Sequence, residues 1–191
     1  MILSRLKHET KSYHDALEKS LFLGERVFSL AEYQAMLGRF WGLYRPIEAH
    51  LATFAQWSSY DFDLNQRLKT GLIERDLQAF GWTAGAIAAL PICPIAASLP
   101  DFHRAVGGLY VLEGATLGGQ LIARHLYTTL DLTSHHGAAF FTSYGAAVGP
   151  MWLGFRALVG AVAQSTAAED AIVAGAIATF VAFEHWLGVV Q

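Results

Sequence analysis

Four side chains near the start of the sequence are spaced so that they share one face of a helix. Lys7, Lys11, His14 and Glu18 are separated by four, three and four residues, and residues at these separations are neighbours on a helix surface. His14 can offer one imidazole nitrogen to a metal ion, while Glu18 accepts the proton of the other nitrogen. Such a carboxylate fixes the tautomer of a histidine ligand and raises its basicity. The alternative is an ordinary solvated face with an ion pair between His14 and Glu18.

A second stretch, from Gly107 to Leu126, combines a helical pattern with five glycines, although glycine inside a helix costs about 1 kcal/mol relative to alanine. At 100° per residue, Gly107, Gly114 and Gly118 fall within about 40° of one another, and Gly119 lies at the edge of this strip. One side of the helix is then bare backbone, which a broad flat ligand can approach closely. Alternatively, the pair Gly114 and Gly118 seats a neighbouring helix.

The two stretches together predict a slot for a flat, acidic ligand that contains a metal ion. One helix offers a histidine and two lysines, and the other offers a wall of backbone. Haem is planar, contains iron and carries two propionates. We therefore expect haem between these helices, with His14 as the metal ligand.

Three segments resemble the heme oxygenase family, and specifically the bacterial type that accompanies bacteriophytochromes. Leu6–Glu18, LKHETKSYHDALE, resembles the proximal helix of the family. Leu109–Ile122, LYVLEGATLGGQLI, resembles the distal helix, and Thr179–Leu187, TFVAFEHWL, resembles the last helix. The resemblance implies an all-α, single-domain helical bundle with haem between the proximal and distal helices.

The resemblance also implies a role for each matching residue. The residues expected to bind haem are Lys7, Lys11, His14, Glu18, Gly114, Gly118, Gly119 and Arg156. In this set His14 is the iron ligand and Glu18 is its hydrogen-bond partner. Lys7, Lys11 and Arg156 are expected to contact the propionates.

On the distal helix, the expected catalytic positions are Gly114, Ala115 and Gly118. Ala115 stands where many members of the family have an aspartate, and Val111 stands where the mammalian type has an arginine. A positioned acid contributes orders of magnitude to a rate that depends on proton transfer. The alanine therefore leaves proton delivery to backbone groups, water and other polar residues.

The implied activity is oxidative cleavage of haem to biliverdin, carbon monoxide and ferrous iron. It uses O2 and electrons from an external donor such as a ferredoxin, a flavoprotein or another reductant. The bilin would supply a bacteriophytochrome with its chromophore. Two alternatives stay open: a non-catalytic haem carrier or sensor on the same fold, and a haem-free helical enzyme of related shape, such as a thiaminase-like protein.

The elements that must position these residues are helical throughout, because apolar residues recur at a helical period. Ser29 with Glu32, and Thr166 with Glu169, match the capping-box pattern at the start of a helix, and Asp101 is expected to cap the glycine-rich helix. The predicted helices are 3–21, 29–57 with a kink at Pro46, 64–80, a helix starting at 101, 143–163 and 166–187. Loops are expected over 81–100 and 131–142, and the whole chain, 1–191, is expected to form one domain.

Composition limits the other functions. Hydrophobic residues make up 53% of the 191 residues and charged residues 15%, with a formal net charge of −3. No basic block is present, so nucleic acid is not an expected partner. The one cysteine, Cys93, excludes an intrachain disulfide, and we interpret it as a small buried thiol. The N-terminal charges argue against a signal peptide, and we expect a cytoplasmic protein without a membrane-spanning helix.

Overall fold

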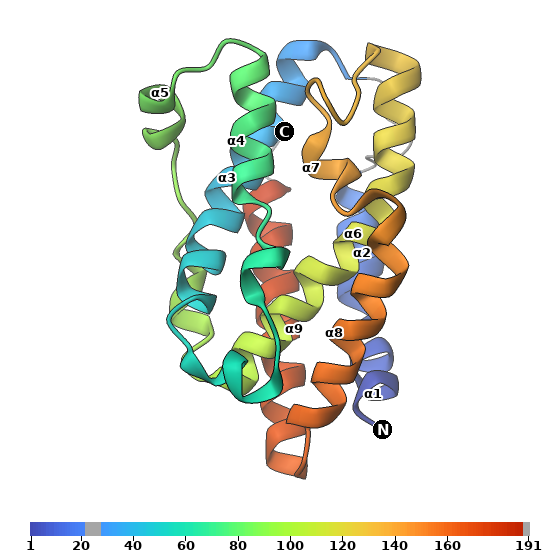
Figure 1. Ribbon diagram of the computed structural model, residues 1–191. Coiled ribbons are helices and arrows are strands. Elements are labelled where there is room, and N and C mark those ends of the chain that lie inside the picture. Colours follow the sequence, from blue (N-terminus) through green and yellow to red (C-terminus); the bar gives the residue numbers. More distant parts are fainter. Residues whose placement is uncertain (22–27, 189–191) are drawn as a thin grey trace.

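A computed structural model describes residues 1–21 and 28–188 of the chain, and within these ranges it contains helices and no strand. The all-α class is therefore confirmed. Figure 1 shows the helices arranged as a bundle, with the long helices α6 and α9 crossing at its centre. The α-helices are α1 (Ile2–Glu9), α2 (Lys11–Leu21), α3 (Leu30–Leu51), α4 (Thr70–Ala79), α5 (Ala84–Ala88), α6 (Phe102–Leu130), α7 (Ala139–Thr142), α8 (Val148–Val162) and α9 (Thr166–Leu187). Short 3₁₀ helices are η1 (Ala55–Tyr60), η2 (Leu64–Arg67), η3 (Pro94–Ser98) and η4 (Gly145–Ala147).

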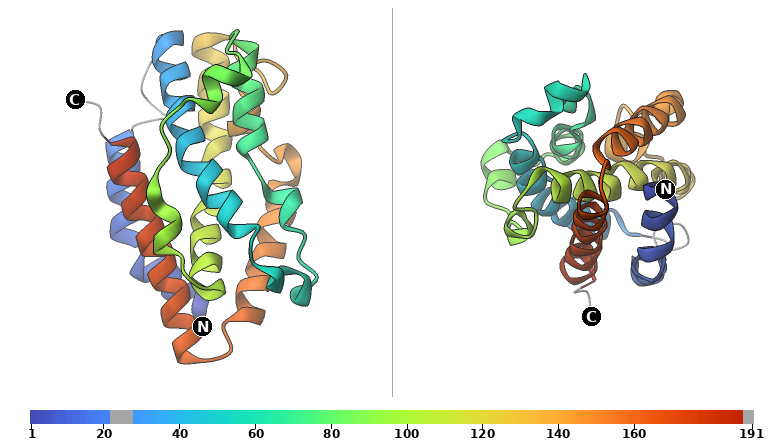
Figure 2. Two further views of the ribbon diagram at one scale, coloured as in Figure 1. Left: turned by 90° about the vertical axis from the view of Figure 1, so that its left-hand side faces the viewer. Right: turned by 90° about the horizontal axis from the view of Figure 1, so that it is seen from below.

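The packing of α6 against α9 depends on glycines in both helices. A Cβ atom added to Gly107 would lie 1.9 Å from the carbonyl oxygen of Ile172, and one added to Gly175 would lie 2.1 Å from that of Arg104. The two backbones therefore touch near the start of α6. Both α2 and α6 pack against α9, so α9 is the element that sets their relative position (Figure 2).

The predicted starts of three helices are resolved in detail. Ser29 and Glu32 form the predicted capping box at α3, and the Asp101 carboxylate accepts the Arg104 N–H at 3.0 Å at the start of α6. The cap of α9 was predicted wrongly. Its N-cap is Ser165, whose hydroxyl accepts the Ala168 N–H at 3.1 Å, because the extended backbone that a cap needs is found at that residue.

Several predicted helices are shorter or divided. The N-terminal helix is split at Thr10, so Lys7 lies on α1 and His14 on α2. The second helix contains Pro46 but ends at Leu51. The third begins only at Thr70, after a 3₁₀ turn.

The start of α4 is determined by a buried carboxylate from another helix. Glu48 on α3 accepts the backbone N–H of Lys69 at 2.6 Å and that of Thr70 at 3.0 Å. These amides lie at the start of α4, where no intrahelical acceptor exists. Burial raises the pKa of the Glu48 carboxyl, and the hydrogen bonds from Thr70 and Lys69 oppose this effect.

The segments expected to be loops contain short helices, α5 and η3 in 81–100 and α7 at the end of 131–142. Cys93, just before η3, is buried, and its N–H donates to the carbonyl oxygen of Gly42 at 2.8 Å. Burial raises the pKa of this thiol. The interpretation of Cys93 as a buried thiol is therefore confirmed.

Two stretches, Ala139–Val162 and Thr166–Leu187, are long and apolar enough to cross a membrane by length and composition. The second is α9, which packs against α2, α3 and α6, and core helices of soluble proteins have the same composition. The first comprises α7, η4 and α8 and is interrupted at Ser143, where φ is +46°. These two stretches are weak evidence for a membrane-spanning helix. That the protein has no such helix stays a prediction.

Candidate active site

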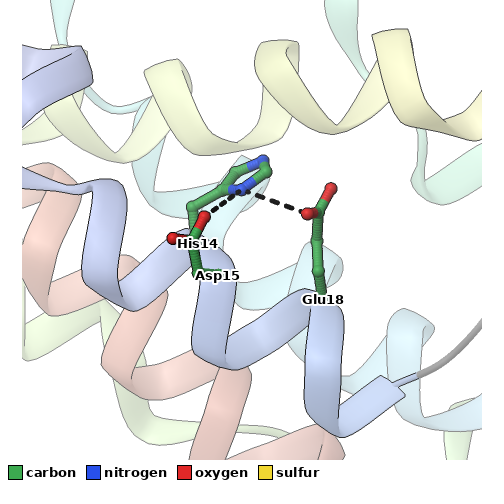
Figure 3. A group of neighbouring side chains, drawn as sticks. All are labelled: His14, Asp15 and Glu18. Atoms are coloured by element: carbon green, nitrogen blue, oxygen red, sulfur yellow. Dashed lines mark ion pairs between the residues drawn. The ribbon is translucent and has the colours of Figure 1, made fainter.

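His14 lies on α2 with its imidazole about half exposed. The side chain is 53% exposed, and its Nδ1 atom lies 3.6 Å from Oε2 of Glu18 and 3.9 Å from Oδ1 of Asp15 (Figure 3). Phe180 of α9 approaches the imidazole edge-on, with ring centroids 6.0 Å apart. His14 and Glu18 are therefore neighbours at ion-pair distance, as both interpretations of this face require, and the ring is accessible to a ligand. The hydrogen bond between them stays a prediction.

Asp15 is an addition that the helical spacing did not reveal. His14, Asp15 and Glu18 each offer a metal-ligand atom, and these atoms lie within 4.8 Å of one another. The carboxylates of Asp15 and Glu18 both lie on the Nδ1 side of the imidazole. Nε2 is therefore the nitrogen available to an incoming metal. Figure 3 shows the ring projecting from α2 toward the yellow part of α6.

Two of the predicted glycines on α6 face open space. A Cβ atom added to Gly114 or to Gly118 would meet no described atom within 4 Å. Gly107 differs because α9 covers it, and a Cβ atom at Gly119 would lie 2.8 Å from the carbonyl oxygen of Phe141. The alternative that the pair Gly114 and Gly118 seats a neighbouring helix is therefore wrong. Gly107 was expected to belong to the bare strip but is covered by α9, so of these three glycines only Gly114 and Gly118 leave α6 bare.

Leucines beside the bare backbone are exposed. Leu121 is 67% exposed and Leu117 is 42% exposed. At 100° per residue, Leu121 lies about 20° and Leu117 about 60° from Gly114 around the helix. Exposed apolar surface next to an uncovered backbone is suited to a flat apolar ligand. The spacing of Leu117 and Leu121 from Gly114 is visible in the sequence, but their exposure follows only from the tertiary structure.

The predicted cations lie on different elements. Lys7 is exposed on α1, and Lys11 is exposed at the start of α2 and forms an ion pair with Asp15. Arg156 is exposed on α8. These positions leave all three side chains accessible to solvent. Ala115, the position that lacks the aspartate, is also exposed.

A buried polar cluster adjoins the bare part of α6, and the sequence analysis missed it. It consists of Arg67, Lys69, Glu113 and Tyr144, and we call it the Glu113 cluster. The Glu113 carboxylate, 1% exposed, accepts hydrogen bonds from Arg67 and from the Tyr144 hydroxyl, the latter at 2.6 Å. Lys69 Nζ lies 3.7 Å from the same carboxylate and donates to the Tyr144 oxygen at 2.7 Å.

The charge state of Lys69 reflects its burial. The side chain is 3% exposed, and the loss of solvent lowers the pKa of its ammonium to about 8, although Glu113 and Glu48 act in the opposite direction. Arg67 is held further by a hydrogen bond to the carbonyl oxygen of Met151 at 2.9 Å. The cluster therefore links η2, α6 and the segment leading into α8.

Residues 1–188 match the heme oxygenase family over nearly the whole chain. The protein belongs to the heme oxygenase family. It is therefore a haem-degrading enzyme that forms biliverdin and takes haem as its cofactor, and the haem-free alternative is rejected. A search of proteins with curated functions finds no match.

Solved structures of three heme oxygenases have the same fold as this one. The enzyme from Neisseria meningitidis, solved with NO and CO bound, is 21% identical, with a TM-score of 0.79, and the match covers 100% of this chain and 94% of that one. The enzyme from Leptospira interrogans is 16% identical, with a TM-score of 0.81 and 99% of each chain covered. Heme oxygenase-1 from the cyanobacterium Synechocystis, in complex with heme, is 21% identical, with a TM-score of 0.77 and 97% and 90% covered.

Proposed function

We propose that this heme oxygenase binds haem between α2 and α6, with His14 Nε2 as the iron ligand. The observation that carries the proposal is the pairing of an exposed imidazole on α2 with uncovered backbone at Gly114 and Gly118 on α6. Leu121 adds apolar surface that the macrocycle would cover. The residues present therefore suit a planar ligand that contains a metal ion.

On the proximal side, Glu18 positions the ligand. Its carboxylate faces Nδ1 of His14 at 3.6 Å, and a small side-chain rotation would bring the two atoms within hydrogen-bond distance. A proton held on Nδ1 keeps Nε2 unprotonated and available for iron. Neutral imidazole thus becomes the ligand, and the adjacent carboxylate raises its basicity.

Three cations are proposed to bind the propionates. Lys7, Lys11 and Arg156 come from α1, α2 and α8 and are exposed, so all three are accessible to an acidic group from solvent. Arginine can bind a carboxylate with two parallel hydrogen bonds, whereas lysine acts as a point charge. Arg156 is therefore the cation best suited to fix the orientation of the ligand.

On the distal side, Gly114, Ala115 and Gly118 are proposed to line the reaction centre, and Gly119 supports them by packing against Phe141. When bound, haem supplies the iron that activates O2 and is itself the molecule that is cleaved. Bare backbone at Gly114 and Gly118 allows close approach and offers polar groups that can hold a water molecule. Ala115 cannot carry a proton, so backbone-bound water is proposed to deliver it.

The physiological partners belong to the same proposal. Electrons come from a ferredoxin, a flavoprotein or another external reductant, and the reaction takes place in the cytoplasm. Resemblance of the segment Glu113–Gly119, EGATLGG, to the bacterial type supports a bacteriophytochrome as the recipient of the biliverdin.

A hemin titration of His14→Ala tests the assignment of the iron ligand. We expect the wild-type protein to give a sharp Soret band and His14→Ala to lose it or shift it strongly, because no iron–imidazole bond can form there. His135→Ala, at an exposed position in the connector before α7, is the matched control and should behave as the wild type. Identical spectra for all three proteins would refute the assignment.

Turnover tests the product and its proposed recipient. The hemin complex, supplied with a reductant and O2, should yield a bilin that absorbs red light and that chromatography identifies as biliverdin. Adding an apo-bacteriophytochrome to the products should then give the spectrum of an assembled chromoprotein. Haem that persists unchanged under these conditions would contradict the proposed site, and biliverdin that the phytochrome does not take up would refute the proposed recipient.

A further inference from the structure

The Glu113 cluster is attached to α6 at the residue that precedes the bare backbone. Glu113 is followed directly by Gly114. Its carboxylate is bonded by Arg67 and by the Tyr144 hydroxyl, so it is held from η2 and from the segment after α7 at the same time. The position of this one side chain therefore fixes where the Gly114 backbone lies.

The C-terminal end of α7, which leads directly into Ser143 and Tyr144, contacts α6 beyond the bare backbone. The Gln120 side chain donates to the carbonyl oxygen of Thr142 at 2.8 Å, and Gly119 packs against the carbonyl of Phe141. Tyr144 contacts Glu113 from the other end of this short segment. Residues 141–144 therefore brace α6 on both sides of the open stretch from Gly114 to Gly118.

The segment 141–144 contains one residue, Ser143, in an unfavourable backbone conformation. Ser143 has a φ of +46° and a ψ of −116°, which is disfavoured for a residue with a side chain. Its buried Oγ has no hydrogen-bond partner among the described residues. Backbone strain of this kind persists only where the surroundings determine the geometry. Here the contacts of Phe141, Thr142 and Tyr144 with α6 do so.

The open stretch of α6 needs external support. Gly114 and Gly118 have no described neighbour on their open side, and glycine is a weak helix former. Burying the charges of Arg67, Lys69 and Glu113 contributes little net stability because each loses its hydration. What such a cluster provides is a defined geometry, since every member must keep its partners.

We propose that Glu113 and Tyr144 are positioning residues, which hold the Gly114–Gly118 backbone of α6 at a fixed height above the haem and thereby determine which meso carbon reacts. The inference rests on the proposed function, because it takes the Gly114–Gly118 backbone as the distal wall. Neither residue touches the haem in this account. They act through the backbone that does.

Amide hydrogen exchange in the haem-free protein tests the support of α6 directly. Tyr144→Phe removes the hydroxyl that joins Glu113 to Lys69 and keeps the ring. We expect the amides of residues 114–118 to exchange about tenfold faster, because a hydrogen bond to a charged group is lost. Tyr127→Phe, at an exposed tyrosine on the same helix, is the matched control and should leave these rates unchanged.

Two measurements on the haem complex test the consequence for the site. Tyr144→Phe should change the ratio of biliverdin isomers and shift the C–O stretching frequency of the ferrous complex with CO, since both depend on the position of the distal wall. A residue that only contributed stability would lower the melting temperature and leave the isomer ratio and the stretching frequency as in the wild type. That result in a folded, hemin-loaded variant would overturn the proposal.

Glu113→Gln provides a second variant with the same shape and no charge. It should change the exchange rates and isomer ratio in the same direction as Tyr144→Phe. If Glu113→Gln does not fold, the test of the positioning role uses Tyr144→Phe alone. That variant keeps the charged side chains of Arg67, Lys69 and Glu113. A wild-type protein that fails to bind hemin would refute the proposed function. Normal wild-type binding with unchanged rates, frequency and isomers in Tyr144→Phe would refute only the positioning role.

Discussion

At the scale of single residues, the proposed distal wall depends on the absence of a side chain at Gly118. A methyl group at Gly118 would meet no described atom within 4 Å, so the structure itself gives no reason for glycine there. Helix propensity favours alanine by about 1 kcal/mol. Glycine at position 118 therefore makes the helix less stable than alanine would. A ligand that occupies the space beside Gly118 would explain why glycine is found there.

Gly118→Ala should therefore separate stability from function. We expect the free energy of unfolding in urea to rise by up to about 1 kcal/mol, while the dissociation constant for hemin increases because the new methyl group enters the slot. Gly160→Ala on α8, also in open space, should give the stability gain without the change in hemin binding. Equal hemin affinity in both variants would contradict the assignment of the distal wall.

At the scale of elements, the helical wheel predicted which residues share a face and could not predict what covers that face. Gly107, Gly114 and Gly118 share a direction around α6, as the spacing indicated. The crossing with α9 covers only Gly107. Which glycine seats a helix and which faces a ligand depends on where two helices cross, and this is a property of the tertiary structure.

Gly107→Ala should accordingly behave opposite to Gly118→Ala. The added Cβ atom would lie 1.9 Å from the Ile172 carbonyl oxygen and 2.7 Å from the Ala176 nitrogen, and backbone cannot move aside as a flexible side chain can. Overpacking of this kind costs about 1–3 kcal/mol or more. Thermal denaturation of the two variants would show it, and a Gly107→Ala protein as stable as the wild type would contradict the described α6–α9 crossing.

At the scale of the whole molecule, the buried charges are what the sequence could not predict. Glu113 meets Arg67 and Tyr144 across separations of 46 and 31 residues, and no local pattern links such positions. The proximity of His14 and Glu18 was easier to predict because the two residues lie about one helical turn apart. The split at Thr10 and the cap at Ser165 show that element boundaries were predicted less well than element types.

Lys69 should make stability depend on pH in a defined direction. Its pKa is about 8 in the folded protein and about 10.4 when unfolded, so between these values the unfolded chain binds more protons and stability rises with pH. The free energy of unfolding of the wild type minus that of Lys69→Met should increase by about 2 kcal/mol from pH 8 to pH 10. Burial also raises the pKa of Tyr33 and Tyr44. Both tyrosines are present in the wild type and in Lys69→Met, so their effect on the free energy of unfolding cancels when one value is subtracted from the other.

Urea denaturation at a series of pH values measures this difference. Lys19→Met, at an exposed position on α2, is the matched control and should differ from the wild type by the same amount at every pH. A difference for Lys69→Met that stays constant or falls between pH 8 and pH 10 would show that the ammonium is not destabilised by burial.

A crystal structure of the protein grown with hemin would show directly whether haem occupies the proposed site. We predict iron bound to Nε2 of His14, with the Glu18 carboxylate at Nδ1 and the macrocycle lying against the backbone of Gly114 and Gly118. A structure with His14 away from the iron, or with the space beside Gly114 and Gly118 filled by protein, would contradict it.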